Sequence, residues 1–158
     1  MTSNGYIVNY SSDFILFQEA GDFRLSQYNI SPLSQIQKVR FSKNDQYYNQ
    51  IMIWEGEAEK VGISYKIDLS NWQAIFKSLK SYGLNIIVEC EDPEIESFTI
   101  GPIIKATKKL VYIQNFDISG FFDEKPTSID FESITKVQFD DRYINVFSKY
   151  LRHRKSKK

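Results

Sequence analysis

The sequence has a single cysteine, Cys90, and a single histidine, His153, among its 158 residues. One cysteine cannot form an intrachain disulfide, which is typical of proteins from a reducing compartment. A metal site needs clustered His, Cys and carboxylate ligands, and a nucleophilic triad needs an ordered histidine. Cys90 stands in an apolar run, where a thiol is usually an inert core residue, and His153 stands in a basic terminal segment. We therefore expect no metal, no cofactor and no catalysis.

Motifs for phosphate binding and membrane insertion are also missing. The sequence contains neither G-x-x-x-x-G-K-[ST] nor G-x-G-x-x-G, and no apolar run approaches the ~18 residues that span a bilayer. Its first ten residues lack the basic and apolar regions of a secretory signal. The acidic pairs Asp140-Asp141 and Asp123-Glu124 do not converge naturally, because neighbours on a strand point to opposite faces. We expect a cytoplasmic protein that is not an enzyme and does not bind membranes.

The chain also has no net charge. Lys plus Arg and Asp plus Glu number 20 each, whereas nucleic-acid binding favours a basic domain. The charges are nevertheless segregated, with acidic runs at residues 55–59 and 89–96 and a basic run at residues 152–158. The basic run has two interpretations: it complements the end of a preceding helix, or it forms an arm that contacts phosphates.

Aromatic residues are abundant, at 15% of the chain, within a hydrophobic content of 42%. This content is sufficient for a packed core and excludes a disordered chain. Phe and Tyr dominate, and such rings favour half-buried strands. They also serve as anchors at binding interfaces.

Two regions of the chain, one near each end, resemble each other. The matching blocks lie 96 positions apart at first and 98 positions apart at the end, so two residues are gained in a polar stretch between them. The paired blocks are GYIV at 5–8 and GPII at 101–104, FILFQ at 14–18 and LVYIQ at 110–114, and IQKVRF at 36–41 and ITKVQF at 134–139.

Each region is predicted to form a small β-meander. The first has strands at 6–10 and 14–19, a hairpin with Gly21, a strand ending near Ile30, one helical turn at 31–34 and a last strand at 35–41. The second has strands at 102–106 and 110–115, a hairpin with Gly120, a strand ending near Ile129, a turn at 130–133 and a last strand at 134–139. Ser31 and Asp130 are the predicted caps of the two helical turns.

A different segment lies between these two regions. Residues 51–54 and 62–67 are predicted strands, and 84–90 is a largely apolar strand that we expect to be central. Residues 71–81 are a predicted helix, with Ser70 as its cap, Gly83 after its end, and Trp72, Ile75, Phe76 and Leu79 on its buried face. A second helix is predicted at 143–151, with Tyr143, Ile144, Phe147 and Leu151 along one side.

Four strands with a one-turn helix before the last resemble the small SH3-like or Sm-like barrel. This resemblance implies a fold and no particular activity. We therefore predict a mainly β protein of the α+β class, with two related SH3-like β-meander repeats joined by a central strand-helix-strand segment. The predicted divisions are residues 1–49, 50–100, 101–151 and a basic, disordered tail at 152–158. Whether the repeats form two barrels or one merged sandwich stays open.

The candidate binding residues lie where acidic and aromatic side chains meet. The second hairpin places two adjacent phenylalanines among carboxylates, and the first hairpin is similar in kind. Aromatic anchors ringed by acid suit docking to a basic protein. The alternative is that one phenylalanine of each hairpin packs inward and the acids are solvated. The candidates are Asp22, Phe23, Asp117, Phe121, Phe122, Asp123, Glu124, Glu91, Asp92 and Glu94.

A small, aromatic-rich protein with acidic patches and no catalytic motif resembles the immunity proteins of contact-dependent inhibition and related polymorphic toxin systems. The resemblance implies a non-catalytic, protein-binding module that neutralises a bacterial toxin, such as a basic nuclease, by direct contact. The alternative is an RNA-binding protein that uses SH3- or Sm-like barrels and the basic C-terminal run.

Overall fold

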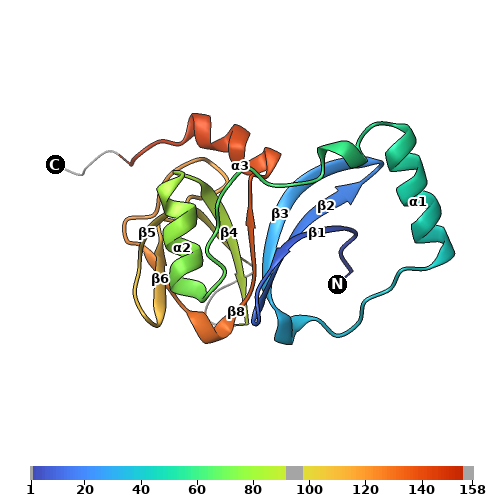
Figure 1. Cartoon of the computed structure of the whole chain (residues 1–158). Helices are drawn as coiled ribbons and strands as arrows, with labels where there is room; N and C mark the ends of the chain where they lie inside the picture. The colour runs from blue at the N-terminus through green and yellow to red at the C-terminus, as the bar shows by residue number, and fades with distance from the viewer. Residues whose placement is uncertain (1, 92–97, 155–158) are drawn as a thin grey trace.

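The computed structural model describes residues 2–91 and 98–154. Within these ranges, eight strands form one antiparallel sheet with the order β1-β2-β3-β8-β4-β5-β6-β7 (Figure 1). The protein is therefore mainly β, with helices packed around the strands. The strands are β1 Gly5–Tyr10, β2 Phe14–Gly21, β3 Arg24–Pro32, β4 Asn85–Cys90, β5 Thr99–Ala106, β6 Leu110–Ile113, β7 Thr127–Asp130 and β8 Ile134–Phe139.

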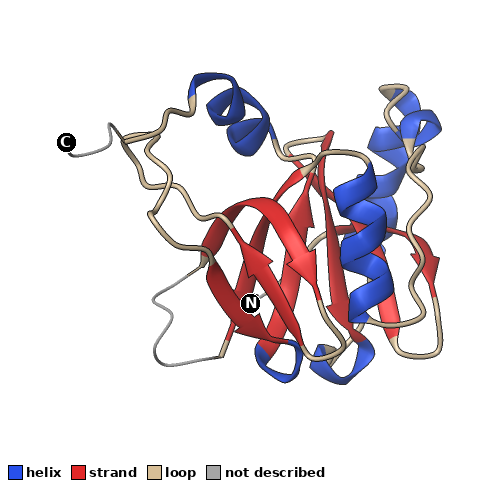
Figure 2. Ribbon diagram, turned by 90° about the vertical axis from the view of Figure 1, so that its left-hand side faces the viewer, coloured by secondary structure: helices blue, strands red, loops and turns tan. Residues whose placement is uncertain are grey.

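The helical elements of the described chain are short. They are α1 Lys43–Trp54, α2 Trp72–Ser81, α3 Arg142–Phe147, and the 3-10 turns η1 Leu33–Gln35, η2 Ala58–Lys60, η3 Phe131–Ser133 and η4 Ser148–Tyr150. Figure 2 shows α3, and the chain that follows it, at one end of the sheet and away from α2. No helix in residues 2–91 or 98–154 has the length and apolar character needed to cross a membrane.

Helix α2 confirms the predicted helix and its apolar face. The Asn71 side chain accepts a hydrogen bond from the backbone N–H of Ala74, so Asn71 is the cap and Ser70 is not. Gly83 follows the helix with a φ of +66°, a conformation that glycine adopts without strain. The predicted face is buried, at Trp72, Ile75, Phe76 and Leu79.

Helix α1 replaces the strand predicted at residues 51–54. The hydroxyl of Ser42 accepts a hydrogen bond from the N–H of Asp45, and the Asp45 carboxylate accepts one from the N–H of Ser42 at 2.7 Å. This capping box starts a helix that continues through the short apolar run. Periodicity cannot distinguish a strand from a helix over four apolar residues, and Met52 alone of the run is fully buried.

Two further strand predictions are wrong. Residues 62–67 form no strand. Instead, the N–H of Gly62 donates to the Gln18 side chain at 3.0 Å, and its carbonyl accepts from the Tyr28 hydroxyl at 2.7 Å. Residues 36–41 also form no strand, although the matching residues 134–139 form β8. The segment at 84–90 does form a central strand, because β4 lies between β8 and β5.

The predicted SH3-like barrels are not confirmed, because the described sheet is not closed. Strands β1 and β7 are the two ends of its strand order, and they do not pair with each other. Strand β8 ends the second region of the sequence but pairs with β3 of the first region, with Asn29 opposite Gln138. The result is one continuous open sheet.

The two β segments (β1–β3 with η1, and β5–β7 with η3) share detailed backbone geometry. The N–H of Ser11 donates to the carbonyl of Phe14 at 2.9 Å, and 96 positions later Thr107 donates to Leu110 at 2.8 Å. The pairing register of each first strand shifts at the same point, between Ile7 and Asn9 or between Ile103 and Lys105. The final hydrogen bonds also match, from Leu33 to Asp13 and from Phe131 to Lys109.

The main core nevertheless uses opposite faces of the two segments. In β2 the buried residues are Phe14, Leu16, Gln18 and Ala20, whereas in β6 they are Val111 and Ile113, which align with Ile15 and Phe17. Val111 and Ile113 lie in the same buried cluster as the apolar face of α2, and α2 itself packs against β5. The equivalent residues of the first segment, Ile15 and Phe17, are only partly buried.

Candidate protein-binding surface

The acidic and aromatic hairpin of the second segment runs from Phe116 to Phe122, two residues that form an antiparallel bridge. The Asp117 carboxylate accepts hydrogen bonds from the N–H groups of Ser119 and Phe121, at 2.9 and 3.0 Å. Gly120 completes the turn with a φ of +81°. Asp117 thus shapes the loop, and its second carboxylate oxygen is left for another partner.

That partner comes from the C-terminal residues. The Arg154 guanidinium lies 2.9 Å from the second carboxylate oxygen of Asp117. The Arg152 guanidinium donates to the carbonyl of Ser119 at 2.9 and 3.2 Å and lies 4.1 Å from the centre of the Phe121 ring. Arg154 lies 5.2 Å from the same ring. The hairpin therefore holds two guanidinium groups through a carboxylate, a carbonyl and an aromatic face.

Backbone pairing supports this contact. The N–H of Arg152 donates to Gly120 at 2.8 Å, and the carbonyl of Arg152 accepts from Phe122 at 3.2 Å. The His153 ring stacks on Phe122 at 4.9 Å. The prediction of a disordered tail is consequently wrong for residues 152–154, and residues 155–158 lie outside the described chain.

A small second core fixes the hairpin against the sheet. It consists of Ile100, Phe116 and Ile144, with Phe122, Phe147 and Leu151 packed against it. The Phe116 and Phe147 rings stack at 5.2 Å. Phe122 therefore points inward, as the alternative interpretation expected for one phenylalanine of each hairpin. Phe121 lies instead under the two arginines.

The remaining acidic candidates have different surroundings. Asp123 accepts a hydrogen bond from the Asn115 side chain at 3.1 Å, so it serves the structure of the loop. Glu124 is exposed. Glu91 is also exposed, and its N–H donates to the carbonyl of Ser133 at 2.9 Å. The candidates Asp92 and Glu94 lie outside the described residues.

The first hairpin does not join this surface. Asp22 and Phe23 form its tip, with φ values of +49° and +61°. The Phe23 ring stacks on the Tyr48 ring of α1, with the ring centres 4.6 Å apart. The backbone N–H of Phe23 donates to the Tyr48 hydroxyl at 2.9 Å. Phe23 is thus a docking point for α1, whereas the second hairpin binds the C-terminal residues.

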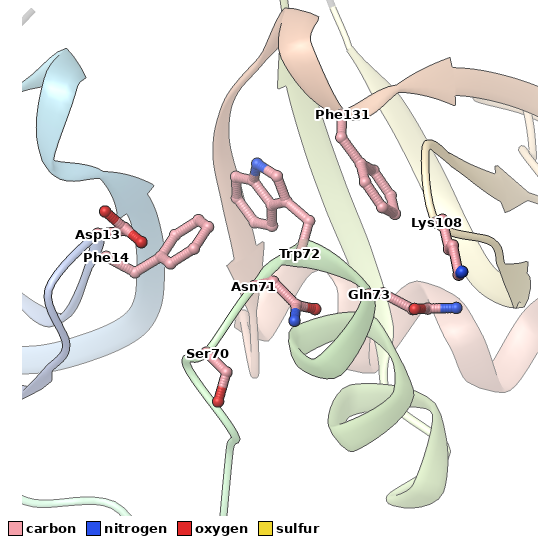
Figure 3. A pocket seen from close by; sticks show the side chains of 8 residues that line it. All are labelled: Asp13, Phe14, Ser70, Asn71, Trp72, Gln73, Lys108 and Phe131. Atoms are coloured by element: carbon pink, nitrogen blue, oxygen red, sulfur yellow. The ribbon is translucent and has the colours of Figure 1, made fainter.

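An open groove of about 620 Å³ lies where the turn before β2, the start of α2, the turn before β6 and η3 meet (Figure 3). Figure 3 shows the rings of Phe14 and Trp72 next to each other. Their centres are 4.8 Å apart and their planes meet at 72°, which is an edge-to-face contact. Both rings are more than nine-tenths buried, so they belong to the core and form only the floor. The amide of Gln73 donates to the carbonyl of Ala106. The lining residues are Asp13, Phe14, Ser70, Asn71, Trp72, Gln73, Lys108 and Phe131.

Residues 2–91 and 98–154 bring together no group of three or more His, Cys, Asp or Glu side chains that could hold a metal ion. Comparison with protein-family models, with curated proteins and with solved structures finds no match. The surface must therefore be interpreted from its own geometry.

Sequence reasoning named Phe121 and Asp117 as candidate binding residues but did not predict their contact with Arg152 and Arg154. The acidic hairpin and the basic run were treated as separate features, although their opposite charges were the available signal. An Arg-x-Arg spacing also places two cations on the same side of an extended chain, which fits a single ring between them.

Proposed function

We propose that the protein is a non-catalytic, protein-binding module whose second hairpin recognises a basic segment of a partner. The contact between Arg152 and Phe121 carries this proposal, because the chain's own residues display the chemistry that the hairpin accepts. A partner with two suitably spaced arginines would find the same ring, the Asp117 carboxylate and the Ser119 carbonyl. Such a partner would compete with residues 152–154.

The biological form of the proposal is an immunity protein that neutralises a basic toxin by direct contact. A toxin that acts on nucleic acid carries cations for its substrate, and an acidic, aromatic surface is complementary to them. A cytoplasmic site of action belongs to the same proposal and is supported by the single cysteine. The RNA-binding alternative is weakened because Arg152 and Arg154 are engaged by Ser119, Phe121 and Asp117.

We also propose that the two β segments are related repeats. Matching hydrogen bonds at Ser11 and Thr107, and matching register shifts after Ile7 and Ile103, support this relationship. Only the second repeat would carry the basic-segment site, because the first hairpin is occupied by α1. A shared ancestry would thus explain the common backbone, while the different tips would explain the different contacts.

Fluorescence anisotropy with a labelled Arg-x-Arg peptide tests the proposed function. Replacing both Arg152 and Arg154 with Ala removes the internal competitor, so we expect the peptide to bind about tenfold more tightly. Adding Phe121→Ala or Asp117→Asn should abolish this gain. The exposed Glu124→Gln provides a matched control that removes one negative charge two residues beyond the hairpin, and it should leave the affinity nearly unchanged.

A labelled single-stranded RNA distinguishes the alternative. RNA binding that disappears in the double arginine variant would support the RNA-binding function and overturn the proposal. Equal peptide affinity in the starting protein, the double variant and the Phe121→Ala variant would also contradict it.

A further inference from the structure

Residues 36–41, here called the unpaired segment, have the sequence of a buried strand without its environment. They read IQKVRF, and β8 reads ITKVQF, with four of six residues identical. In β8 the apolar residues Ile134, Val137 and Phe139 expose 2%, 0% and 0% of their surface. Their counterparts in the unpaired segment, Ile36, Val39 and Phe41, expose 37%, 78% and 66%. The same motif is thus central in one place and exposed in the other.

The backbone of the unpaired segment is also open. Its first residue, Ile36, donates to the carbonyl of Leu33 at 3.0 Å, and no backbone hydrogen bond of the described chain involves residues 37–41. Figure 1 shows the segment as a long connection from η1 to α1. Its end is fixed, because the Arg40 guanidinium donates to the Asp45 carboxylate at 3.1 and 3.2 Å.

A free sheet edge complements this segment. Strand β1 is the first in the strand order, so its outer edge has no neighbour in the described sheet. Ile7 is 56% exposed and Tyr10 is 75% exposed. They lie opposite Phe17 and Ile15 of β2, both only partly buried. Unpaired edges with apolar side chains are templates for strand addition.

The second β segment shows how this face and edge are covered. There Ile103, Val111 and Ile113, which align with Ile7, Ile15 and Phe17, are buried in the core cluster that includes the apolar face of α2. The edge of β5 is paired with β4, which is itself paired with β8. In the first segment both the face and the edge of β1 lack these partners.

We propose that a second copy of this chain supplies the missing strand. The unpaired segment of each copy adds to β1 of the other, so that Val39 and Phe41 cover Ile7 and Tyr10 across a twofold axis. Each chain contains both halves of the contact, a strand without a sheet and an edge without a strand, which is the condition for an isologous dimer. The inference does not depend on the proposed binding of a basic segment.

Area and charge are compatible with this arrangement. The five exposed side chains of each copy are Ile7, Tyr10, Ile36, Val39 and Phe41. At roughly 100 Å² apiece, they would bury on the order of 1,000 Å² of apolar surface, which is about the minimum expected of a specific interface. The chain has no net charge, so two copies approach without long-range repulsion.

Closure within one chain is disfavoured because the unpaired segment ends on α1, and α1 is tied to the first β segment. The Tyr6 hydroxyl donates to Asn49 at 2.6 Å, and Phe23 stacks on Tyr48 at 4.6 Å. Moving the segment onto its own β1 would disturb these contacts and the bond from Arg40 to Asp45.

Sedimentation of the full chain from about 1 to about 100 µM tests the proposal, and we expect a monomer–dimer equilibrium. Val39→Pro removes an N–H that has no partner in the described chain but is needed for strand pairing. Ile7→Lys places a charge on the covered face. Each should weaken the dimer at least about tenfold without lowering the thermal midpoint of a dilute sample. Ile53→Lys, on α1 at 49% exposure, is the matched control and should dimerise normally.

Hydrogen exchange identifies the contact. Amides of residues 5–10 and 37–41 should gain protection as the concentration rises. A monomer at every concentration would overturn the proposal. Exposed amides in that monomer would indicate that the edge binds another protein, and protected amides would indicate that the segment pairs with β1 of its own chain. A dimer that survives both Val39→Pro and Ile7→Lys would overturn it as well.

Discussion

The guanidinium carbon of Arg152 lies 4.1 Å from the centre of the Phe121 ring, so the chain places one of its own cations on its second acidic and aromatic hairpin. A cation over an aromatic face contributes about 0.5–1 kcal/mol at an exposed site. The contact is therefore weak enough for a tightly binding partner to replace it. It links residues that are 31 positions apart and that the sequence places in separate features.

The first prediction concerns this contact. Arg152→Ala removes the ring contact and the two hydrogen bonds to the Ser119 carbonyl, so we expect the free energy of unfolding to fall by about 1 kcal/mol. Urea unfolding measures this change, and the NMR signals of the stacked Phe122 and His153 rings should shift. Arg142→Ala, at an exposed position of α3, is the control and should change neither.

The second prediction compares the two copies of one motif. Val137→Ala creates a cavity in the centre of the sheet, so it should lower the free energy of unfolding by about 2 kcal/mol. Val39→Ala, at 78% exposure, should change it by less than about 0.5 kcal/mol. Chemical unfolding of dilute samples keeps self-association out of the comparison. Equal losses would mean that residues 36–41 are packed in solution.

The third prediction concerns two equivalent glycines. A Cβ on Gly101 would overlap the backbone carbonyl of Gln114, and a Cβ on Gly5 would overlap that of Gln18. Both have positive φ values, +155° and +157°. We expect each Gly→Ala change to cost about 3 kcal/mol or more, because a backbone atom cannot move aside as a side chain can.

Gly21 is the matched control for these two variants. It ends β2, and a Cβ there would meet nothing within 4 Å. Gly21→Ala should therefore be nearly neutral in thermal unfolding. A similar loss at all three positions would contradict the close backbone approach described for Gly5 and Gly101.

The fourth prediction concerns pH. The Arg40 guanidinium, followed by hydrogen bonds from Ser42, lowers the pKa of Asp45 from its ordinary value of 3.8 to about 2. Because the folded state favours the charged carboxylate, the stabilising contribution is present above the ordinary value and is lost as the pH falls toward 2. NMR titration of the carboxyl carbon should give a midpoint near 2, and Arg40→Gln should raise it. An unchanged midpoint in that variant would exclude the ion pair.

Local sequence signals predicted many elements correctly. The apolar spacing of residues 72–79 and the glycine at position 83 indicated α2, and the matching apolar blocks with their turns indicated β1, β2 and β8. The cap of η3 is also as predicted, because the Asp130 carboxylate accepts a hydrogen bond from the N–H of Glu132 at 3.2 Å. These elements depend on nearby residues, so the information for them is local.

The same signals failed where a long-range partner decides the outcome. Nearly identical motifs form β8 and the unpaired segment, since only β8 finds neighbours on both sides, at β3 and β4. The short run at 51–54 became part of α1 because a capping box nine residues earlier set the helix. A pattern of apolar residues specifies which side chains can be buried but does not specify the surface that buries them.

The sequence by itself determined the mainly β composition, the positions of most strands, the α2 helix and the acidic, aromatic character of the second hairpin. Tertiary structure alone decided that β8 would cross to β3, that opposite faces of the two β segments would share one core, and that Arg152 would lie on Phe121. The physical reason is that propensity and alternation act over a few residues, whereas sheet order and docking depend on contacts between distant parts of the chain.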